Sequence, residues 1–380
     1  MRIAVDARPL AAPLTGIGRY TRSLLEMMIA QGHQWFLYSD RPLQIHLPHN
    51  PRVSVRHGDA IGGTPGSLRW AQWQFPRWCV QDIVDLFWSP RHHLPLMLDR
   101  RITSVVTIHD LVWRQFPETM LPKNLWLERL LMGPSIRRAD RVICVSRFTA
   151  SEVSRYYGSA VGKCQVIHEA AETDVAVSHR VSNLPPQYFL FVGTLEPRKN
   201  LPRLLQAYAT LRDDPVVPPL VIVGGEGWGN EDLPGLIEAL QLADRVKLYG
   251  YVSDAELQTI YAGAHCLLMP SLYEGFGLPV LEAMQHGVPA IASSTSSLPE
   301  VVGDAGLLVS PYAEDALADA MRRMAHEEPL HTTLSALAKA RAAEFSWQRA
   351  AQETLALFEE TLAAHMPRPF KYRALDEPID

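Results

Sequence analysis

The sequence predicts an α/β fold built from two doubly wound, Rossmann-like domains that face each other across a cleft. With 380 residues the chain is too long for one ordinary hydrophobic core, so two domains are expected. Short apolar runs alternate with helical patterns along most of the chain, which indicates parallel sheets covered by helices. The alternation lapses around residues 170–187, where Pro185 and Pro186 mark a linker candidate. In open α/β sheets ligands sit at the carboxyl ends of strands, so the loops there should face the cleft.

The first series of elements predicts a domain over residues 1–182. Its strand candidates are apolar runs, located at 3–7, 35–38, 53–55, 85–88, 104–108 and 141–145. Helical periodicity fills the gaps between them, notably at 16–31, 125–139 and 150–157. Gly32 is expected to stop the first of these helices.

The second series predicts a domain over residues 183–346. Its strand candidates lie at 188–192, 216–223, 246–248, 266–269, 289–292 and 306–309. A final helix at about 347–366 follows Ser346, a favourable N-cap residue, and is expected to pack back on the first domain. The tail at 367–380 is charged and rich in proline, so we expect it to be loosely held.

The composition is that of an ordinary globular protein, and it argues against several functional classes. Charged residues make up 20% of the chain and hydrophobic residues 47%. A net charge of −5 argues against a nucleic-acid binder, which would carry a basic excess. Met1 leads straight into a strand without a signal-peptide pattern, and no apolar run approaches the ~20 residues that a membrane span needs. The cysteines lack metal or redox spacing, which together with these features predicts a cytoplasmic protein: Cys79, Cys144, Cys164 and Cys266.

Residues 271–287 combine a strand end, a glycine loop and the start of a helix. Apolar residues run up to Pro270, and Pro279 then suits the first turn of a helix, where its missing N–H would be unpaired anyway. Gly287 is a suitable residue to end that helix. Free backbone N–H groups and the helix dipole at such a terminus attract anions, so we expect a phosphate here.

A second anion site follows the first strand of the second domain. Gly193 permits close approach of a ligand, and the adjacent cations Arg198 and Lys199 suit a diphosphate. The plainer interpretation is a solvated turn before a helix.

Two carboxylates in the 271–287 stretch allow different interpretations. Glu274 and Glu282 resemble a glycosidase pair, but eight residues of helix span roughly 12 Å. Catalytic carboxylate pairs lie about 5 to 9.5 Å apart. Binding roles fit better, with Glu282 accepting ribose hydroxyls and Glu274 accepting sugar hydroxyls. The plainer alternative for Glu282 is a solvent-facing helix carboxylate.

These segments together resemble the retaining glycosyltransferases of family 4, which have the GT-B fold. The residues from Glu274 to Glu282 match the family's E-x7-E element, and those from Gly193 to Asn200 match its G-x-x-x-x-R-K-N segment. Residues 250–254 and 303–309 match as well, so the resemblance covers nearly the whole chain.

The resemblance implies a role for each matching residue. Arg198 and Lys199 would hold the donor diphosphate, Glu282 the ribose and Glu274 the donor sugar. Backbone groups would complete the site, serving the sugar and phosphates at Phe276, Gly277 and Leu278, and the base at Tyr251 and Val252.

Gly16 and Gly18 could belong to a dinucleotide fingerprint, with Asp40 as its acidic residue. Thr21 stands where a third glycine is required, and the loop from Ala7 to Gly16 is too long for the tight turn of that motif. An NAD-dependent oxidoreductase is therefore disfavoured. The resemblance implies instead that the Gly16 loop closes over the donor diphosphate.

His109 follows a predicted strand and resembles the family's histidine that faces the donor sugar. The alternative is a strand-end histidine that hydrogen-bonds to its neighbours. A metal site made by His92, His93, His109 and Asp110 is weaker, because adjacent side chains on an extended segment point apart. We therefore expect neither a metal ion nor a cofactor.

Residues 69–76 are rich in tryptophan and suggest either a membrane-surface or sugar-stacking element, or a helix that packs its rings into the core. Scattered arginines could attract anionic lipid headgroups or be ordinary surface charges: Arg100, Arg101, Arg137, Arg138 and Arg141.

The implied reaction is retaining transfer of a sugar from a nucleotide-sugar donor to an acceptor hydroxyl. Residues 293–309 and 70–76 look most like bacterial mannosyltransferases of surface polysaccharide assembly, such as O-antigen or capsule synthesis. That implies GDP-mannose as donor, a glycan or lipid-linked glycan as acceptor, and peripheral contact with the cytoplasmic face of the inner membrane. The alternatives are a UDP-sugar donor such as UDP-glucose and, from another class, a non-catalytic nucleotide-sugar-binding module.

Overall fold

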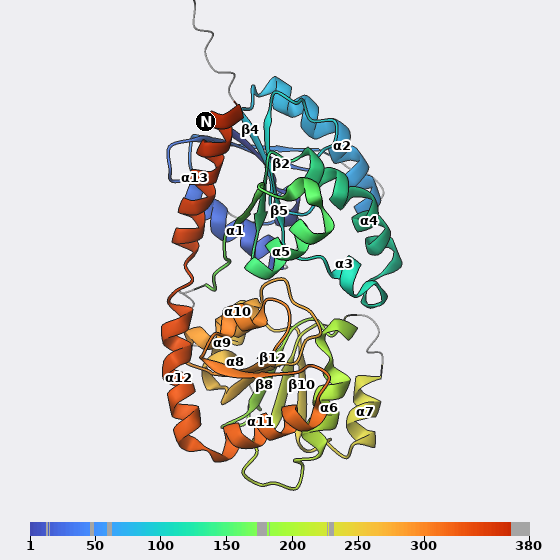
Figure 1. Cartoon of the computed structure of the whole chain (residues 1–380), viewed down its shortest axis with the longest axis vertical. Coiled ribbons are helices and arrows are strands. Elements are labelled where there is room, and N and C mark those ends of the chain that lie inside the picture. The colour runs from blue at the N-terminus through green and yellow to red at the C-terminus, as the bar shows by residue number, and fades with distance from the viewer. Residues whose placement is uncertain are drawn as a thin grey trace, which may run out of the picture.

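The computed structural model describes residues 1–12, 14, 16–45, 49–58, 63–172, 181, 183–225, 227 and 232–365. Two lobes lie one above the other, each with a parallel sheet at its centre and helices on both faces (Figure 1). We call the lobe built on strands β1–β7 the N-terminal domain and the lobe built on β8–β13 the C-terminal domain. The expected tail at 367–380, and half of the 170–187 segment in which the 182/183 boundary was predicted, lie outside the described residues.

The N-terminal domain contains a seven-stranded parallel sheet of order β3-β2-β1-β4-β5-β6-β7. Its strands are β1 (Arg2–Asp6), β2 (Gln34–Ser39), β3 (Val53–His57), β4 (Leu86–Ser89), β5 (Thr103–Ile108), β6 (Arg141–Cys144) and β7 (Cys164–Val166). The central strands β1, β4 and β5 are almost entirely buried, as expected for a sheet covered on both faces. Strand β7 was not predicted from the sequence, because this short edge strand is only half-buried and has no apolar run.

The helices of this domain connect successive strands. They are α1 (Gly16–Met28), α2 (Gly63–Gln81), α3 (Val112–Gln115), α4 (Pro122–Arg138) and α5 (Arg147–Tyr156), with short 3-10 turns at Arg8–Leu10, Pro117–Thr119 and Gly158–Ala160. The tryptophan-rich stretch lies on α2. Phe75 and Trp78 are buried and Trp70 packs against both, but Trp73 is 62% exposed, so the core interpretation fails for that residue.

The C-terminal domain contains a six-stranded parallel sheet of order β10-β9-β8-β11-β12-β13. Its strands are β8 (Phe189–Val192), β9 (Leu220–Val223), β10 (Val246–Gly250), β11 (Cys266–Met269), β12 (Ala290–Ser293) and β13 (Gly306–Val309). The helices are α6 (Leu201–Ala209), α7 (Leu233–Ala239), α8 (Asp254–Gly263), α9 (Leu278–Gln285), α10 (Leu298–Val302), α11 (Glu314–His326) and α12 (Glu328–Ala342), and a 3-10 turn spans Pro197–Lys199. The predicted pair of doubly wound parallel sheets is confirmed.

Helix α13 (Trp347–His365) leaves the C-terminal domain and lies along the N-terminal domain, where it packs on α1 (Figure 1). The rings of Trp347 and Tyr20 meet edge-on with their centroids 5.9 Å apart, and the ring centroids of Phe358 and Trp88 lie 5.7 Å apart. The chain therefore passes between the two domains twice. None of the helices in the described part of the chain is long and apolar enough to cross a membrane.

Candidate active site

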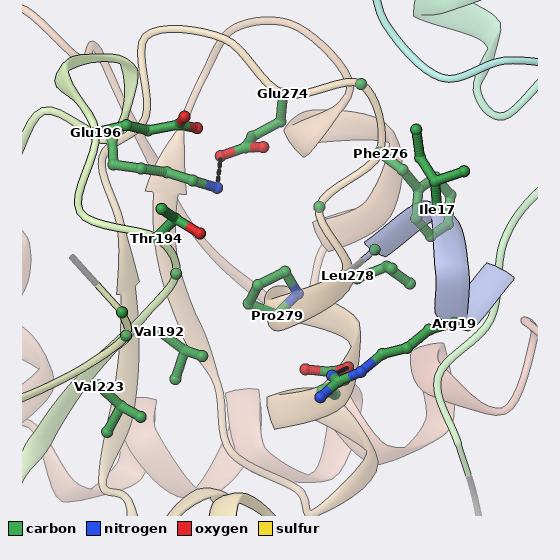
Figure 2. Close-up of a pocket in the computed structure, with 18 of the residues that line it drawn as sticks. Ile17, Arg19, Val192, Thr194, Glu196, Val223, Glu274, Phe276, Leu278 and Pro279 are labelled. Carbon is green, nitrogen blue, oxygen red and sulfur yellow. Dashed lines mark hydrogen bonds and ion pairs between the residues drawn. The ribbon is translucent and has the colours of Figure 1, made fainter. Parts of the chain in front are cut away.

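A cavity of about 400 Å³ lies between the two domains, at the carboxyl ends of strands from both sheets (Figure 2). Its lining includes twelve of the thirteen residues that the sequence analysis placed in the site: Gly16, His109, Gly193, Arg198, Lys199, Tyr251, Val252, Glu274, Phe276, Gly277, Leu278 and Glu282. Gly18 is the exception in this structure. It is buried in α1, where a Cβ atom would lie 3.0 Å from the carbonyl oxygen of Pro9, so close packing favours a glycine at this position.

The N-terminus of α9 opens into this cavity. Gly277 is its N-cap residue and has a φ of +111°, a conformation that L side chains rarely adopt. The hydroxyl of Ser297 donates to the carbonyl oxygens of Glu274 and Phe276 at 2.9 and 2.7 Å, which fixes the loop before the helix. Leu278 and Pro279, the first two residues of α9, line the cavity, so the positive end of the helix dipole and the Leu278 N–H lie beside it, as an anion site requires.

Arg198, Lys199 and Glu274 form one ion-paired cluster in front of α9. The Lys199 Nζ lies 2.7 Å from one oxygen of Glu274, and the Arg198 Nη1 lies 2.8 Å from the other. Arg198 also pairs with Glu196 and donates to the carbonyl oxygen of Tyr273 at 2.7 Å. The resemblance assigned the two cations to the diphosphate and Glu274 to the sugar, and the structure adds that both cations contact Glu274 directly.

Burial and charge act in opposite directions on this cluster. Burial would raise the pKa of Glu274, but Lys199 and Arg198 outweigh it and lower that pKa to about 2. Burial would lower the pKa of Arg198, but Glu274 and Glu196 raise it above its ordinary value. Glu274 and Arg198 are therefore both charged at neutral pH.

Asn200 anchors the turn that carries the two cations. Its side-chain amide donates to the carbonyl oxygens of Pro270 and Pro311 at 3.0 and 2.8 Å, which ties the turn to the ends of β11 and β13. The interpretation of this segment as a merely solvated turn is wrong, because Lys199 and Asn200 are both buried.

Glu282 lies on α9 and faces the cavity rather than solvent, so the plainer alternative for this residue is also wrong. The Tyr261 hydroxyl donates to one of its oxygens at 2.7 Å. Arg19 approaches the other oxygen to 3.6 Å. Burial raises the pKa of Glu282, while Tyr261 and Arg19 oppose that effect.

His109 follows β5 and lies in the cavity wall with both ring nitrogens engaged. Its Nδ1 lies 3.0 Å from a carboxylate oxygen of Glu169, and its Nε2 lies 2.9 Å from the carbonyl oxygen of Pro90. The ring of Tyr20 meets it edge-on at 4.8 Å. His109 is therefore a strand-end histidine that hydrogen-bonds to its neighbours, as the alternative had it. Its position in the cavity wall also agrees with the resemblance, which implies a histidine that faces the donor sugar.

His92 and His93 do not diverge as expected. Their rings both reach Glu128, at 3.4 and 3.0 Å, because this carboxylate on α4 lies between them. The positive charge of the two histidines lowers the pKa of Glu128 although burial would raise it. Within the described ranges, no group of three or more His, Cys, Asp or Glu side chains is arranged to hold a metal ion.

The two domains touch through the glycine loop itself. The carbonyl oxygen of Gly275 accepts hydrogen bonds from Ser146 and Thr149 of the N-terminal domain, at 2.8 and 3.2 Å. A Cβ atom on Gly275 would lie 2.0 Å from the carbonyl oxygen of His109, so only glycine permits this approach. The backbone N–H of Leu111 also donates across the interface, to the Tyr273 hydroxyl at 2.9 Å.

Arg19, Glu169, Glu196 and Gly275 are among the lining residues of this site that were not found from the sequence. Glu169 comes three residues after β7, so recognising that strand would have placed it at the sheet edge that faces the cleft. Arg19 directly follows the Gly16 loop, and Glu196 lies within the segment that was recognised. No local pattern marks Gly275, because its role depends on contact with the other domain.

Comparison with known proteins gives this geometry a context. Residues 14–175 match the family described as Glycosyltransferase Family 4, and residues 176–341 match Glycosyl transferases group 1. The chain is 31% identical over 382 residues to an O-antigen chain mannosyltransferase B from Escherichia coli, covering 93% of this chain and 98% of that protein.

Solved structures agree on the fold. A sucrose-phosphate synthase from Thermosynechococcus elongatus superposes with a TM-score of 0.77 at 23% identity, covering 96% of this chain and 100% of that one. Anabaena HepE in complex with UDP and glucose gives a TM-score of 0.74 at 20% identity, covering 94% and 99%. The two family matches, the related mannosyltransferase and the cleft between two Rossmann-like domains lead to one conclusion: this chain is a glycosyltransferase of family 4, group 1, with the GT-B fold.

Proposed function

We propose that this enzyme transfers mannose from GDP-mannose to a lipid-linked glycan in bacterial surface polysaccharide synthesis, with retention of anomeric configuration. The observation that carries the proposal is the cluster of Arg198 and Lys199 in front of the α9 N-terminus, inside a cavity between two domains. The similarity to an O-antigen mannosyltransferase over nearly the whole chain supports mannose as the sugar.

In the proposed reaction, the bond between the sugar C1 and the diphosphate oxygen breaks while the acceptor oxygen attacks the same face. The acceptor proton passes to the departing phosphate oxygen, so no protein nucleophile is required. Arg198, Lys199 and the N–H groups of α9 stabilise the negative charge that develops on the leaving group. Contact between the domains at Gly275 keeps water away from the sugar.

The donor test is a calorimetric comparison of GDP, UDP and ADP binding to the purified protein. We expect GDP to bind most tightly, and tighter binding of UDP would overturn GDP-mannose as the donor. UDP-glucose is the alternative, since the Anabaena neighbour was solved with UDP and glucose. The anomeric configuration of the product, read by NMR, tests retention separately.

We propose further that the acceptor is reached at a membrane surface. Helices α2 and α4 expose Trp73 and Trp126, at 62% and 64%, and Arg77 and Arg129, about one turn further along the same helices, are exposed as well. Aromatic and cationic side chains together suit an anionic lipid interface. Co-sedimentation with vesicles containing anionic lipid should be lost in a Trp73→Ser, Trp126→Ser double variant, and unchanged binding of that variant would contradict this surface.

A further inference from the structure

Arg19 is a cation that the N-terminal domain contributes to a cavity whose other arginine and lysine come from the C-terminal domain. It lies near the start of α1, just after the Gly16 loop. Among the described residues that line the cavity, it is the only Arg or Lys from its own domain. Figure 2 shows its side chain reaching across to α9, below Leu278 and Pro279.

Two carboxylates of the C-terminal domain hold Arg19 in this position. One is Asp254, in the first turn of α8, and the other is Glu282, whose oxygen lies 3.6 Å from the Arg19 Nη1. Burial would lower the pKa of Arg19, but Glu282 and Asp254 raise it, so the guanidinium is charged. The Asp254 side chain is 45% exposed, and a pair at such a site contributes little and is readily exchanged.

The guanidinium has more hydrogen-bond donors than these partners use. Arginine carries five N–H donors and no acceptor. Of the two carboxylates, only Asp254 accepts a hydrogen bond from Arg19, because the nearest Glu282 oxygen lies 3.6 Å from the guanidinium. Arg19 therefore presents unused donors to a cavity that also holds the anion site of α9.

The distance from Arg19 to that anion site is short. Glu282 lies four residues after Leu278, the first residue of α9, which is about 6 Å along the helix axis. A nucleotide whose ribose contacts Glu282 would place its diphosphate toward the start of α9, within reach of the Arg19 side chain. Guanidinium groups bind phosphate as a planar fork with two parallel hydrogen bonds.

We propose that Arg19 binds a phosphate group of the donor from the opposite domain, exchanging its contact with Asp254 for the ligand. This inference rests on the proposed function, in which the cavity holds a nucleoside diphosphate sugar. Arg19 is then a specificity-determining residue that recognises the phosphates, and the donor site is complete only when both domains contribute to it.

The chain offers a matched control on the same helix. Arg22 lies three residues after Arg19 and has the same charge, but it pairs with Glu172 and Glu26 instead of the cavity carboxylates. Arg22→Gln and Arg19→Gln therefore change the net charge of α1 by the same amount, and only Arg19→Gln removes a group from the cavity.

The experiment measures binding of GDP and of guanosine to wild type, R19Q, R19K, R22Q and D254N by calorimetry. We expect R19Q to weaken GDP binding roughly tenfold or more, as for loss of a charge-assisted hydrogen bond, with guanosine binding nearly unchanged. R19K should lie between R19Q and wild type, since it keeps the charge and loses the fork. R22Q should match wild type, and D254N should bind GDP at least as tightly as wild type.

Several outcomes would overturn this role. R19Q that binds GDP as wild type does would remove Arg19 from the donor site, and an equal loss for guanosine and GDP would mean that it does not contact the phosphates. A loss in D254N as large as that in R19Q would contradict the exchange of partners. If the wild type binds GDP while R19Q and R22Q are equally impaired, this inference fails and the proposed function stands. If the wild type binds none of GDP, UDP and ADP, the proposed function fails first.

Discussion

Replacing Glu274 by glutamine would remove a carboxylate that both Arg198 and Lys199 contact. The amide keeps the size of the side chain, so the change is mainly one of charge. Arg198 keeps its pair with Glu196, whereas Lys199, which is 7% exposed, loses its carboxylate partner. A buried cation left without a counter-ion destabilises the folded state.

The size of the effect follows from the pKa of Glu274. That pKa falls from 4.5 to about 2 on folding, and at about 1.36 kcal/mol per pKa unit the difference corresponds to roughly 3 kcal/mol. Because the folded-state pKa is the lower one, this stabilisation is fully present above pH 4.5 and is lost as the pH falls toward 2. We therefore expect E274Q to lower the free energy of unfolding by about 3 kcal/mol at pH 7, and by progressively less below pH 4.5.

Chemical denaturation with and without saturating GDP measures both this loss and its cause. A diphosphate supplies negative charge to the two cations, so GDP should stabilise E274Q more than it stabilises the wild type, while sugar transfer by E274Q is lost. E26Q is the control, because Glu26 forms a surface pair on α1 and its loss should change stability by less than about 1 kcal/mol. Unfolding of E274Q at the same denaturant concentration as the wild type would refute the stabilising role of this carboxylate, and near-normal transfer would refute its role in the donor site.

Three further predictions concern transfer itself. K199M should reduce kcat/KM at least about 100-fold, because the enzyme loses a preorganised positive charge that stabilises the leaving diphosphate. The far-UV circular dichroism of K199M should remain native, and wild-type turnover by this variant would contradict the role of Lys199 in binding the diphosphate. G275A should lower kcat far more than it weakens GDP binding, because a Cβ atom would lie 2.0 Å from the His109 carbonyl oxygen and hold the domains apart. An unchanged kcat would argue against contact between the domains at this loop during turnover. Transfer should continue at the full rate in excess chelator, whereas its loss, restored by added divalent cation, would require a metal ion in the mechanism.

The sequence predicted the strands of the sheets well where an apolar run ended at a sharp boundary. β11 and β13 have the expected bounds, because His265 and Pro270 enclose one run and Gly306 begins the other. β9 was expected from residue 216 but begins at Leu220, since Pro218 and Pro219 have no N–H to donate to a neighbouring strand. The first helix was expected to reach residue 31 and ends at Met28, just before the chain turns at Gly32 with a φ of +68°.

The candidate site was predictable to the extent that its residues follow strands in recognisable segments. Arg198, Lys199, Glu274 and His109 all lie where the ends of strands were expected to meet. Their partners were harder to predict, because the pairing of His109 with Glu169 joins residues sixty positions apart. Contacts between domains, such as those of Arg19, have no local sequence pattern at all, since they depend on how two independent sheets are oriented.

Helix α13 has a consequence for the order in which this protein can fold during synthesis. The N-terminal domain leaves the ribosome first, but the face formed by Tyr20 and Trp88 is covered by Trp347 and Phe358. That face remains without its partner helix until the whole C-terminal domain has been translated. Until then the nascent chain carries an uncovered aromatic surface, and transiently exposed apolar surface of this kind promotes aggregation. A stop codon before residue 347 would leave it permanently in that state.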